Sequence, residues 1–210
     1  MTMHIYGSKL SPFVMRPVLA ARAKGHELEP EDFDGGIKSD AYRALSPIAK
    51  MPLLVDGDFA LPESQPITDY LDRKLSGPAL APDDLQAAAR MRLIVRIADI
   101  YLVPSLTGIF RRAANPEGVP AALAGLGDAL GYIEHYRDAG DEFVVGDAFT
   151  VADATLIPLF FFLDVFNKSL GTGQLVADRP GLAAWWARAK ASDLGSRCLA
   201  EQSAALRAVS

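Results

Sequence analysis

Residues 50–64 read KMPLLVDGDFALPES, and this stretch decides the fold. The Asp56-Gly57 pair separates two apolar runs, which predicts a two-stranded hairpin. Ser64 stands before apolar residues that recur at helical spacing, so it is predicted to cap a helix. The backbone groups of Met51 and the amide and hydroxyl of Ser64 are groups that a small anionic peptide could bind. The stretch therefore predicts a fold element and a binding site together.

Strand and helix patterns alternate before that stretch. Met3 to Tyr6 is a short β-prone run, and Glu27 to Phe33 has an extended pattern. Between them, Phe13 to Lys24 carries an apolar face and ends at Gly25, which is typical of a helix C-terminus. The order of strand, helix, strand, hairpin and helix predicts a small α/β domain over residues 1–77.

The sequence changes character after Gly77. Residues 78–84 are rich in proline and small residues, which indicates a linker. Strand patterns largely vanish beyond it, so residues 85–210 are predicted to form an all-α domain. The predicted helices are 84–115, kinked at Pro104, then Ala121 to about Ala139, a helix that begins at Thr150 with Asp153 in a capping box, and 180–191.

Composition excludes several classes of protein. The net charge of −5 argues against nucleic acid as the main partner, and no charged N-terminal segment leads into an apolar run as in a signal peptide. The longest apolar run, Ala154 to Phe166, is too short to cross a membrane and is interpreted as a buried helix. Cys198 is the single cysteine, which fits a reducing cytoplasm. The histidines lack metal-ligand spacing, so no metal is expected.

Each candidate site residue, taken alone, is better explained as ordinary structure. The Met51-Pro52 dipeptide favours a trans bond, because cis bonds are a minority even before proline. Ser64 and Ser11 both have the pattern of a helix cap, and Pro12 suits the first helical position. Glu63 alone is a common solvated acid in a first turn.

Taken in order, the motifs resemble the cytosolic glutathione transferases of the serine-type classes, similar to the tau, zeta or omega classes and to bacterial members. The resemblance covers nearly the whole chain. The motifs that carry it are Ser11-Pro12-Phe13 with Lys24-Gly25, the run 46–52 (SPIAKMP), Glu63-Ser64 with Tyr70-Leu71, Thr150 with Asp153, and Pro180 with Leu182 and Trp185.

The resemblance implies a thioredoxin-like domain followed by an α-helical bundle, with glutathione as co-substrate. Ser11 would donate a hydrogen bond to the glutathione thiolate, and Met51 would pair with the cysteinyl backbone across a cis bond to Pro52. Glu63 and Ser64 would bind the γ-glutamyl head group, and Lys50 and Lys38 would meet the glycine carboxylate. A small electrophile would bind between the domains, near Phe13, Tyr101 and Phe110.

The implied function is transfer of the glutathione thiolate to a small, mostly apolar electrophile by a cytoplasmic homodimer. Two alternatives stay open: a glutathione-dependent isomerase or ether-cleaving lyase, and a non-catalytic binding or regulatory protein. Tyr6 is a competing hydroxyl for the thiolate, since other classes use a strand tyrosine. Ala49 and Ser46 depart from the family's usual glycine and asparagine, and Pro17 inside the first helix could shift Ser11.

Overall fold

The computed structural model describes residues 3–137 and 140–209, which group into two compact units. The first unit runs to Leu80 and also takes in the last helix, and the second is Ala81–Ser192. The sequence prediction had placed every residue after 84 in the helical domain. The last helix is therefore grouped differently from that prediction, with the N-terminal unit.

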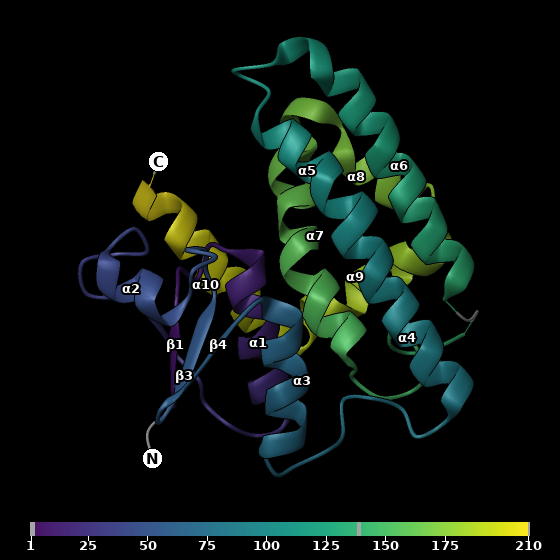
Figure 1. Ribbon diagram of the computed structural model, residues 1–210. Helices are drawn as coiled ribbons and strands as arrows, with labels where there is room; N and C mark the ends of the chain where they lie inside the picture. Colours follow the sequence, from purple (N-terminus) through teal and green to yellow (C-terminus); the bar gives the residue numbers. More distant parts are fainter. Residues whose placement is uncertain (1–2, 138–139, 210) are drawn as a thin grey trace. The chain divides into compact units, whose positions relative to one another are not determined.

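The first unit contains, among its described residues, a four-stranded sheet in the order β2-β1-β3-β4 (Figure 1). Strand β1 (Met3–Tyr6) is parallel to β2 (Pro30–Glu31) and antiparallel to β3 (Leu53–Asp56). Strands β3 and β4 (Phe59–Pro62) pair as a hairpin, which confirms the prediction from the Asp56-Gly57 pair. Gly57 has a φ of 63°, a conformation that glycine adopts without steric cost.

Helices pack against both sides of this sheet. Figure 1 shows α1 (Pro12–Ala23) and α3 (Ser64–Lys74) on one side and α2 (Asp40–Leu45) on the other. Helix α10 (Asp193–Val209) contacts α1. Helix α1 begins at Pro12 and continues past Pro17, so the interior proline does not delay its start and Ser11 keeps the N-cap position.

The second unit is helical throughout its described elements. The predicted helix over 84–115 is divided into α4 (Leu85–Ile97), a π-helical segment (Ala98–Leu102) and α5 (Val103–Phe110). The irregular segment ends two residues before Pro104, which lacks an N–H for the helix ladder. A 3₁₀ turn (Pro116–Gly118) precedes α6 (Val119–Tyr136), whose predicted end at Ala139 lies outside the described residues. The remaining helices are α7 (Val151–Leu170), α8 (Thr172–Ala177) and α9 (Pro180–Ala191).

One stretch, Leu85–Phe110, is long and apolar enough to cross a membrane by length and composition alone. An 18-residue window within it has a mean hydropathy of 1.6, and 39% of that window is buried inside the protein. The run in α7 that the sequence singled out, Ala154 to Phe166, is instead almost wholly buried, as predicted for a core helix.

The start of α7 is held by a buried carboxylate. Thr150 and Asp153 form the predicted capping box. Asp153 is fully buried and accepts hydrogen bonds from the Val144 and Thr150 amides (3.0 and 2.9 Å), the Thr150 hydroxyl (2.9 Å) and the Trp185 indole N–H (2.8 Å). Burial raises the pKa of Asp153, and these donors act in the opposite direction. The Asp153 side chain thus links the capping box at the start of α7 to Trp185 in α9, two motifs that lie far apart in the sequence.

Candidate functional site

A cleft of about 160 Å³ lies at the hairpin and at the start of α3 in the first unit. The chain bends sharply into it from β4, because Glu63 takes a φ of 73° before the helix begins. A positive φ costs a residue with a Cβ of the order of 1–3 kcal/mol and is concentrated at functional sites. The lining residues are Phe13, Ile48, Lys50, Met51, Pro52, Pro62, Glu63 and Ser64. Most of the predicted glutathione-binding residues therefore share one cleft.

The peptide bond between Met51 and Pro52 is cis. This agrees with the expectation from the family resemblance, and the trans bond favoured by the dipeptide alone is wrong. Gly7, at the end of β1, has a φ of 147°, and a Cβ there would lie 2.5 Å from Val14 and 3.2 Å from the Cβ of Met51. Glycine at this position lets Met51 approach the start of α1, which carries Ser11.

The loop before Met51 is fixed from inside the first unit. The Tyr42 hydroxyl donates a 2.7 Å hydrogen bond to the Lys50 carbonyl, and the Tyr42 side chain is fully buried. Burial raises the pKa of Tyr42, which keeps the hydroxyl protonated as a donor. Ala49, where the family usually has glycine, takes a φ of 51°, so the left-handed conformation is kept without the glycine.

The N-terminus of α3 presents groups for an anion. Glu63 occupies the N-cap position and Ser64 is the first helical residue, so the cap lies one residue earlier than the predicted cap at Ser64. Ser64 is 5% exposed, whereas Glu63 is exposed. The first-turn amides of a helix lack intrahelical acceptors and carry the positive end of the helix dipole, so they favour a carboxylate. The Glu63 carboxylate beside them suits an ammonium group, and an α-amino acid carries both charges on one carbon.

Ser11 stands at the N-cap of α1 in an extended conformation (φ −72°, ψ 122°). Its side chain makes no capping hydrogen bond, which differs from the ordinary role of an N-cap serine. The hydroxyl is partly exposed and stands at the positive end of α1. Ser11 does not itself line the cleft, but Phe13, two residues later, does.

The other predicted site residues are more dispersed. Lys38 is exposed on the segment before α2, outside the cleft lining. Tyr101 and Phe110 belong to the second unit, where the Tyr101 ring packs edge-on against Tyr132 and Phe110 packs against Phe162. Their assignment to the electrophile stays a prediction.

The competing hydroxyl of Tyr6 is at the end of β1. Its ring packs edge-on against Phe33, 4.9 Å between centroids, and Phe33 packs in the same way against Tyr42. The ring is thus part of an aromatic row that supports the Lys50 loop.

Sequence reasoning missed Ile48, Pro62 and Tyr42 as parts of the site. Ile48 and Pro62 line the cleft. Ile48 stands inside the motif 46–52, and Pro62 directly precedes the Glu63-Ser64 pair. An isoleucine that is 46% exposed in the loop could have been recognised as a contact residue only after the loop was placed. Tyr42 could not have been found, because the hydrogen bond that links it to Lys50 depends on a helix that the sequence did not predict.

The protein's own thiol is unsuited to nucleophilic chemistry. Cys198 is fully buried on α10, and burial raises its pKa to about 12. Only a thiolate is a strong sulfur nucleophile, so this side chain is inert at neutral pH. Among the described residues, no group of three His, Cys, Asp or Glu side chains could hold a metal ion.

The Tyr42 hydrogen bond gives a testable prediction. We expect Tyr42→Phe to lower the free energy of unfolding by about 1–2 kcal/mol, because the Lys50 carbonyl loses its donor. We also expect the KM for glutathione to rise several-fold with a smaller change in kcat, because Lys50 and Met51 are held less firmly. Steady-state kinetics and urea unfolding measure the two effects. Tyr136→Phe, at an exposed tyrosine of the second unit, should change neither, and an equal effect there would contradict the prediction.

The fold and cleft define a class: a thioredoxin-like unit whose cis-proline loop and helix N-terminus can bind an amino-acid head group, together with a helical unit. Sequence comparison agrees. Residues 5–79 match the family described as "Glutathione S-transferase, N-terminal domain", and residues 111–188 match "Glutathione S-transferase, C-terminal domain". The chain is 30% identical over 200 residues to glutathione S-transferase 3 of Zea mays, covering 87% of this chain and 86% of the relative. It is 29% identical to glutathione S-transferase F13 of Arabidopsis thaliana, covering 89% and 90%.

Solved structures agree with these sequence relatives. The tau-class glutathione S-transferase of mango, Mangifera indica, superposes with a TM-score of 0.81 at 28% identity, covering 99% of this chain and 96% of that one. The chain belongs to the glutathione S-transferase family. The predicted enzyme class, fold class and glutathione co-substrate are thereby confirmed at the level of the family.

Proposed function

We propose that the protein conjugates the glutathione thiolate to a small, mostly apolar electrophile, with Ser11 as the hydrogen-bond donor to the sulfur. The observation that carries the proposal is the cleft, which brings the cis Met51–Pro52 bond together with Glu63 and Ser64 at the start of α3. Met51 would pair with the cysteinyl backbone, and Glu63 with Ser64 would bind the γ-glutamyl head group. Lys50 and Lys38 would attract the glycine carboxylate.

The chemistry depends on the ionisation of the bound thiol. A free thiol has a pKa of about 8.5, so only a few per cent is thiolate at neutral pH. A hydrogen bond from Ser11 to the charged form, and the dipole of α1, both stabilise the thiolate and lower this pKa. The nucleophile is then the sulfur of the co-substrate, and Ser11 acts as a donor and not as a base.

The remaining expectations belong to the same proposal. Isomerisation and ether cleavage by glutathione would begin from the same thiolate, so the role of Ser11 is common to all three reactions. Phe13, Tyr101 and Phe110 would contact the electrophile. The family relationship supports a homodimer and a cytoplasmic location.

Binding to immobilised glutathione tests the head-group assignment. The native protein should be retained and released by free glutathione. Ser64→Ala should weaken retention by about tenfold or more, because a hydrogen bond to a charged group is worth about 1.5–3 kcal/mol. Ser169→Ala is the control and should leave retention unchanged, since Ser169 is an exposed serine of the second unit that is not part of the cleft lining. Equal retention of the Ser64 and native proteins would contradict the assignment, and no retention of the native protein would favour a non-catalytic role.

A further inference from the structure

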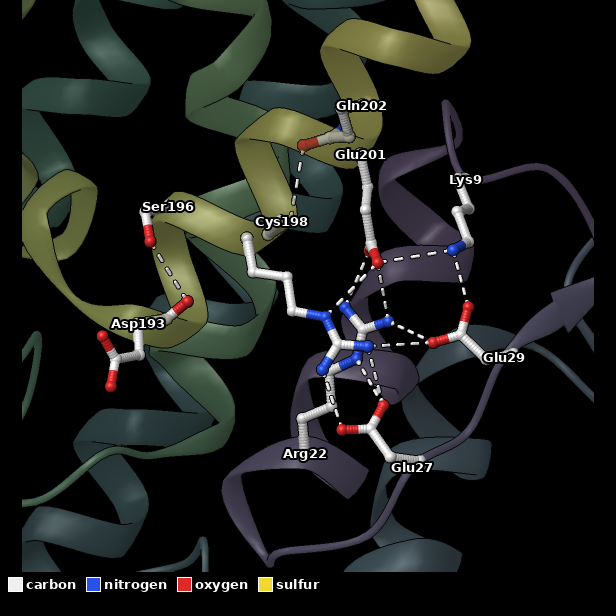
Figure 2. Close-up of polar contacts among 10 residues, drawn as sticks. Lys9, Arg22, Glu27, Glu29, Asp193, Ser196, Cys198, Glu201 and Gln202 are labelled. Atoms are coloured by element: carbon white, nitrogen blue, oxygen red, sulfur yellow. Dashed lines mark hydrogen bonds and ion pairs between the residues drawn. The ribbon is translucent and has the colours of Figure 1, made fainter.

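A cluster of charged side chains joins α10 to the segment that carries Ser11, within the first unit (Figure 2). Figure 2 shows the carboxylates of Glu27, Glu29 and Glu201 around the Arg22 guanidinium. The clustered side chains come from segments that are far apart in the sequence: the loop after β1, the last turn of α1, the loop before β2, and α10. The cations are Lys9, Arg22 and Arg197, and the anions are Glu27, Glu29 and Glu201.

Glu201 and Glu29 each contact all three cations, and Glu201 is the one that stands on α10. It accepts hydrogen bonds from Arg22 (2.8 and 3.0 Å) and from Lys9 (3.3 Å), and it lies 3.4 Å from the Nε of Arg197. The side chains of Glu201 and Arg22 are 18% and 2% exposed, so both charges are largely removed from water. Burial alone would raise the pKa of Glu201, but Arg22 and Lys9 hold this pKa below its ordinary value. Glu201 is therefore an ionised carboxylate with fixed partners.

Lys9 lies inside the turn that ends at Ser11. The Ser11 amide donates to the Ser8 carbonyl (2.9 Å), which makes Lys9 and Leu10 the central residues of a four-residue turn. The Lys9 ammonium is 2.6 Å from a carboxylate oxygen of Glu29 and 3.3 Å from one of Glu201. A side chain held at both carboxylates restrains the turn that leads into α1.

We infer that Glu201 is a positioning residue for Ser11: from α10 it holds Lys9 in the turn before α1 and Arg22 at the end of α1. The inference rests on the role proposed above for Ser11. By fixing both ends of α1, Glu201 sets where the Ser11 hydroxyl stands relative to the bound sulfur. A displacement of about 1 Å in a group of this kind can change a rate by about 100-fold.

Two simpler roles of Glu201 predict different results. If Glu201 only anchors α10, its loss lowers stability and leaves the pKa of bound glutathione unchanged. If its charge acts through space, removing a negative charge stabilises the thiolate and lowers that pKa. Positioning predicts the opposite sign, because a misplaced Ser11 donor stabilises the thiolate less.

The test is a titration of bound glutathione, followed by the ultraviolet absorbance of its thiolate, in the native protein and in Glu201→Gln. We expect the thiol pKa to rise by about half a unit and kcat/KM for an activated aryl halide to fall by about tenfold. Arg197→Gln is the matched control: it removes an α10 charge from the same cluster, but Arg197 is 44% exposed and does not contact Lys9. It should leave the thiol pKa unchanged.

Further variants keep the test decisive. If Glu201→Gln does not fold, Glu201→Asp keeps the charge for Arg22 but shortens the reach to Lys9, and it should raise the thiol pKa as well. In a Lys9→Met background, Glu201→Gln should raise the thiol pKa by less than it does in the native protein, because the part of the effect that passes through Lys9 is already lost.

Ser11→Ala is titrated beside these variants. If Ser11→Ala raises the thiol pKa but the Glu201 variants leave it unchanged or lower it, the positioning role is overturned and Ser11 keeps its role. If Ser11→Ala also leaves the pKa unchanged, the role of Ser11 and the inference that rests on it are both wrong.

Discussion

Replacing Ser11 with alanine is expected to lower kcat/KM for an activated aryl halide by about 100-fold, which is the usual effect of removing one donor to a developing or bound anion. The affinity for glutathione should change less than about threefold, because the proposed head-group site is elsewhere, at Glu63 and Ser64. The physical reason is that Ser11 stands at the N-cap of α1 with a hydroxyl that makes no capping bond. Stopped-flow or steady-state kinetics measure the rate, and calorimetry measures the affinity.

Three variants accompany this experiment. Ser11→Thr keeps a hydroxyl at the N-cap and should keep much of the activity. Ser8→Ala removes an exposed hydroxyl that accepts from the Leu10 amide (3.2 Å) in the turn before Ser11, and it should lower the rate much less than Ser11→Ala. Tyr6→Phe removes the competing hydroxyl, and a large loss there with full activity in Ser11→Ala would move the donor role to Tyr6.

The second large effect concerns the stability of the helical unit. Asp153→Asn is expected to lower the free energy of unfolding by about 3–5 kcal/mol, because buried donors that now face a carboxylate would face an amide N–H₂ group. The donors are the Val144 and Thr150 amides, the Thr150 hydroxyl and the Trp185 indole. Both tryptophans of the chain lie in α9, so tryptophan fluorescence reports on the unfolding of this unit. Urea unfolding of the native and variant proteins is compared at the same protein concentration.

Asp164→Asn is a matched control for the same chemistry. Asp164 is on the same helix and also accepts from an indole, that of Trp186 at 3.3 Å, but its side chain is 43% exposed. We expect a loss below about 1 kcal/mol, as for other exposed carboxylates. Similar losses in the two variants would show that burial of Asp153 is not the cause.

The features predicted well from sequence are those set by local patterns. Gly57 in the hairpin turn, Gly25 after α1 and the capping box at Thr150 each depend on a few adjacent residues. The first helix ends at Ala23, within one residue of the prediction, because Gly25 takes a φ of 83° there. Such local rules depend on adjacent residues and not on contacts with distant parts of the chain.

Features that depend on distant contacts were not predictable from patterns. Helix α10 was missed because its buried residues, Gly195, Cys198 and Gln202, give almost no apolar stripe, and charged residues hold it to α1 instead. For the same reason, the role inferred for Glu201 could not be predicted from the sequence. The cis bond at Met51 required the resemblance to a family, since the dipeptide alone favours trans.

The most direct measurement is a crystal structure of the protein with glutathione bound. The central claim predicts that the sulfur lies within hydrogen-bonding distance of the Ser11 hydroxyl oxygen, with the cysteinyl backbone paired to Met51 and the γ-glutamyl carboxylate at the Ser64 amide. A sulfur that instead lies at the Tyr6 hydroxyl, or out of reach of Ser11, would contradict it.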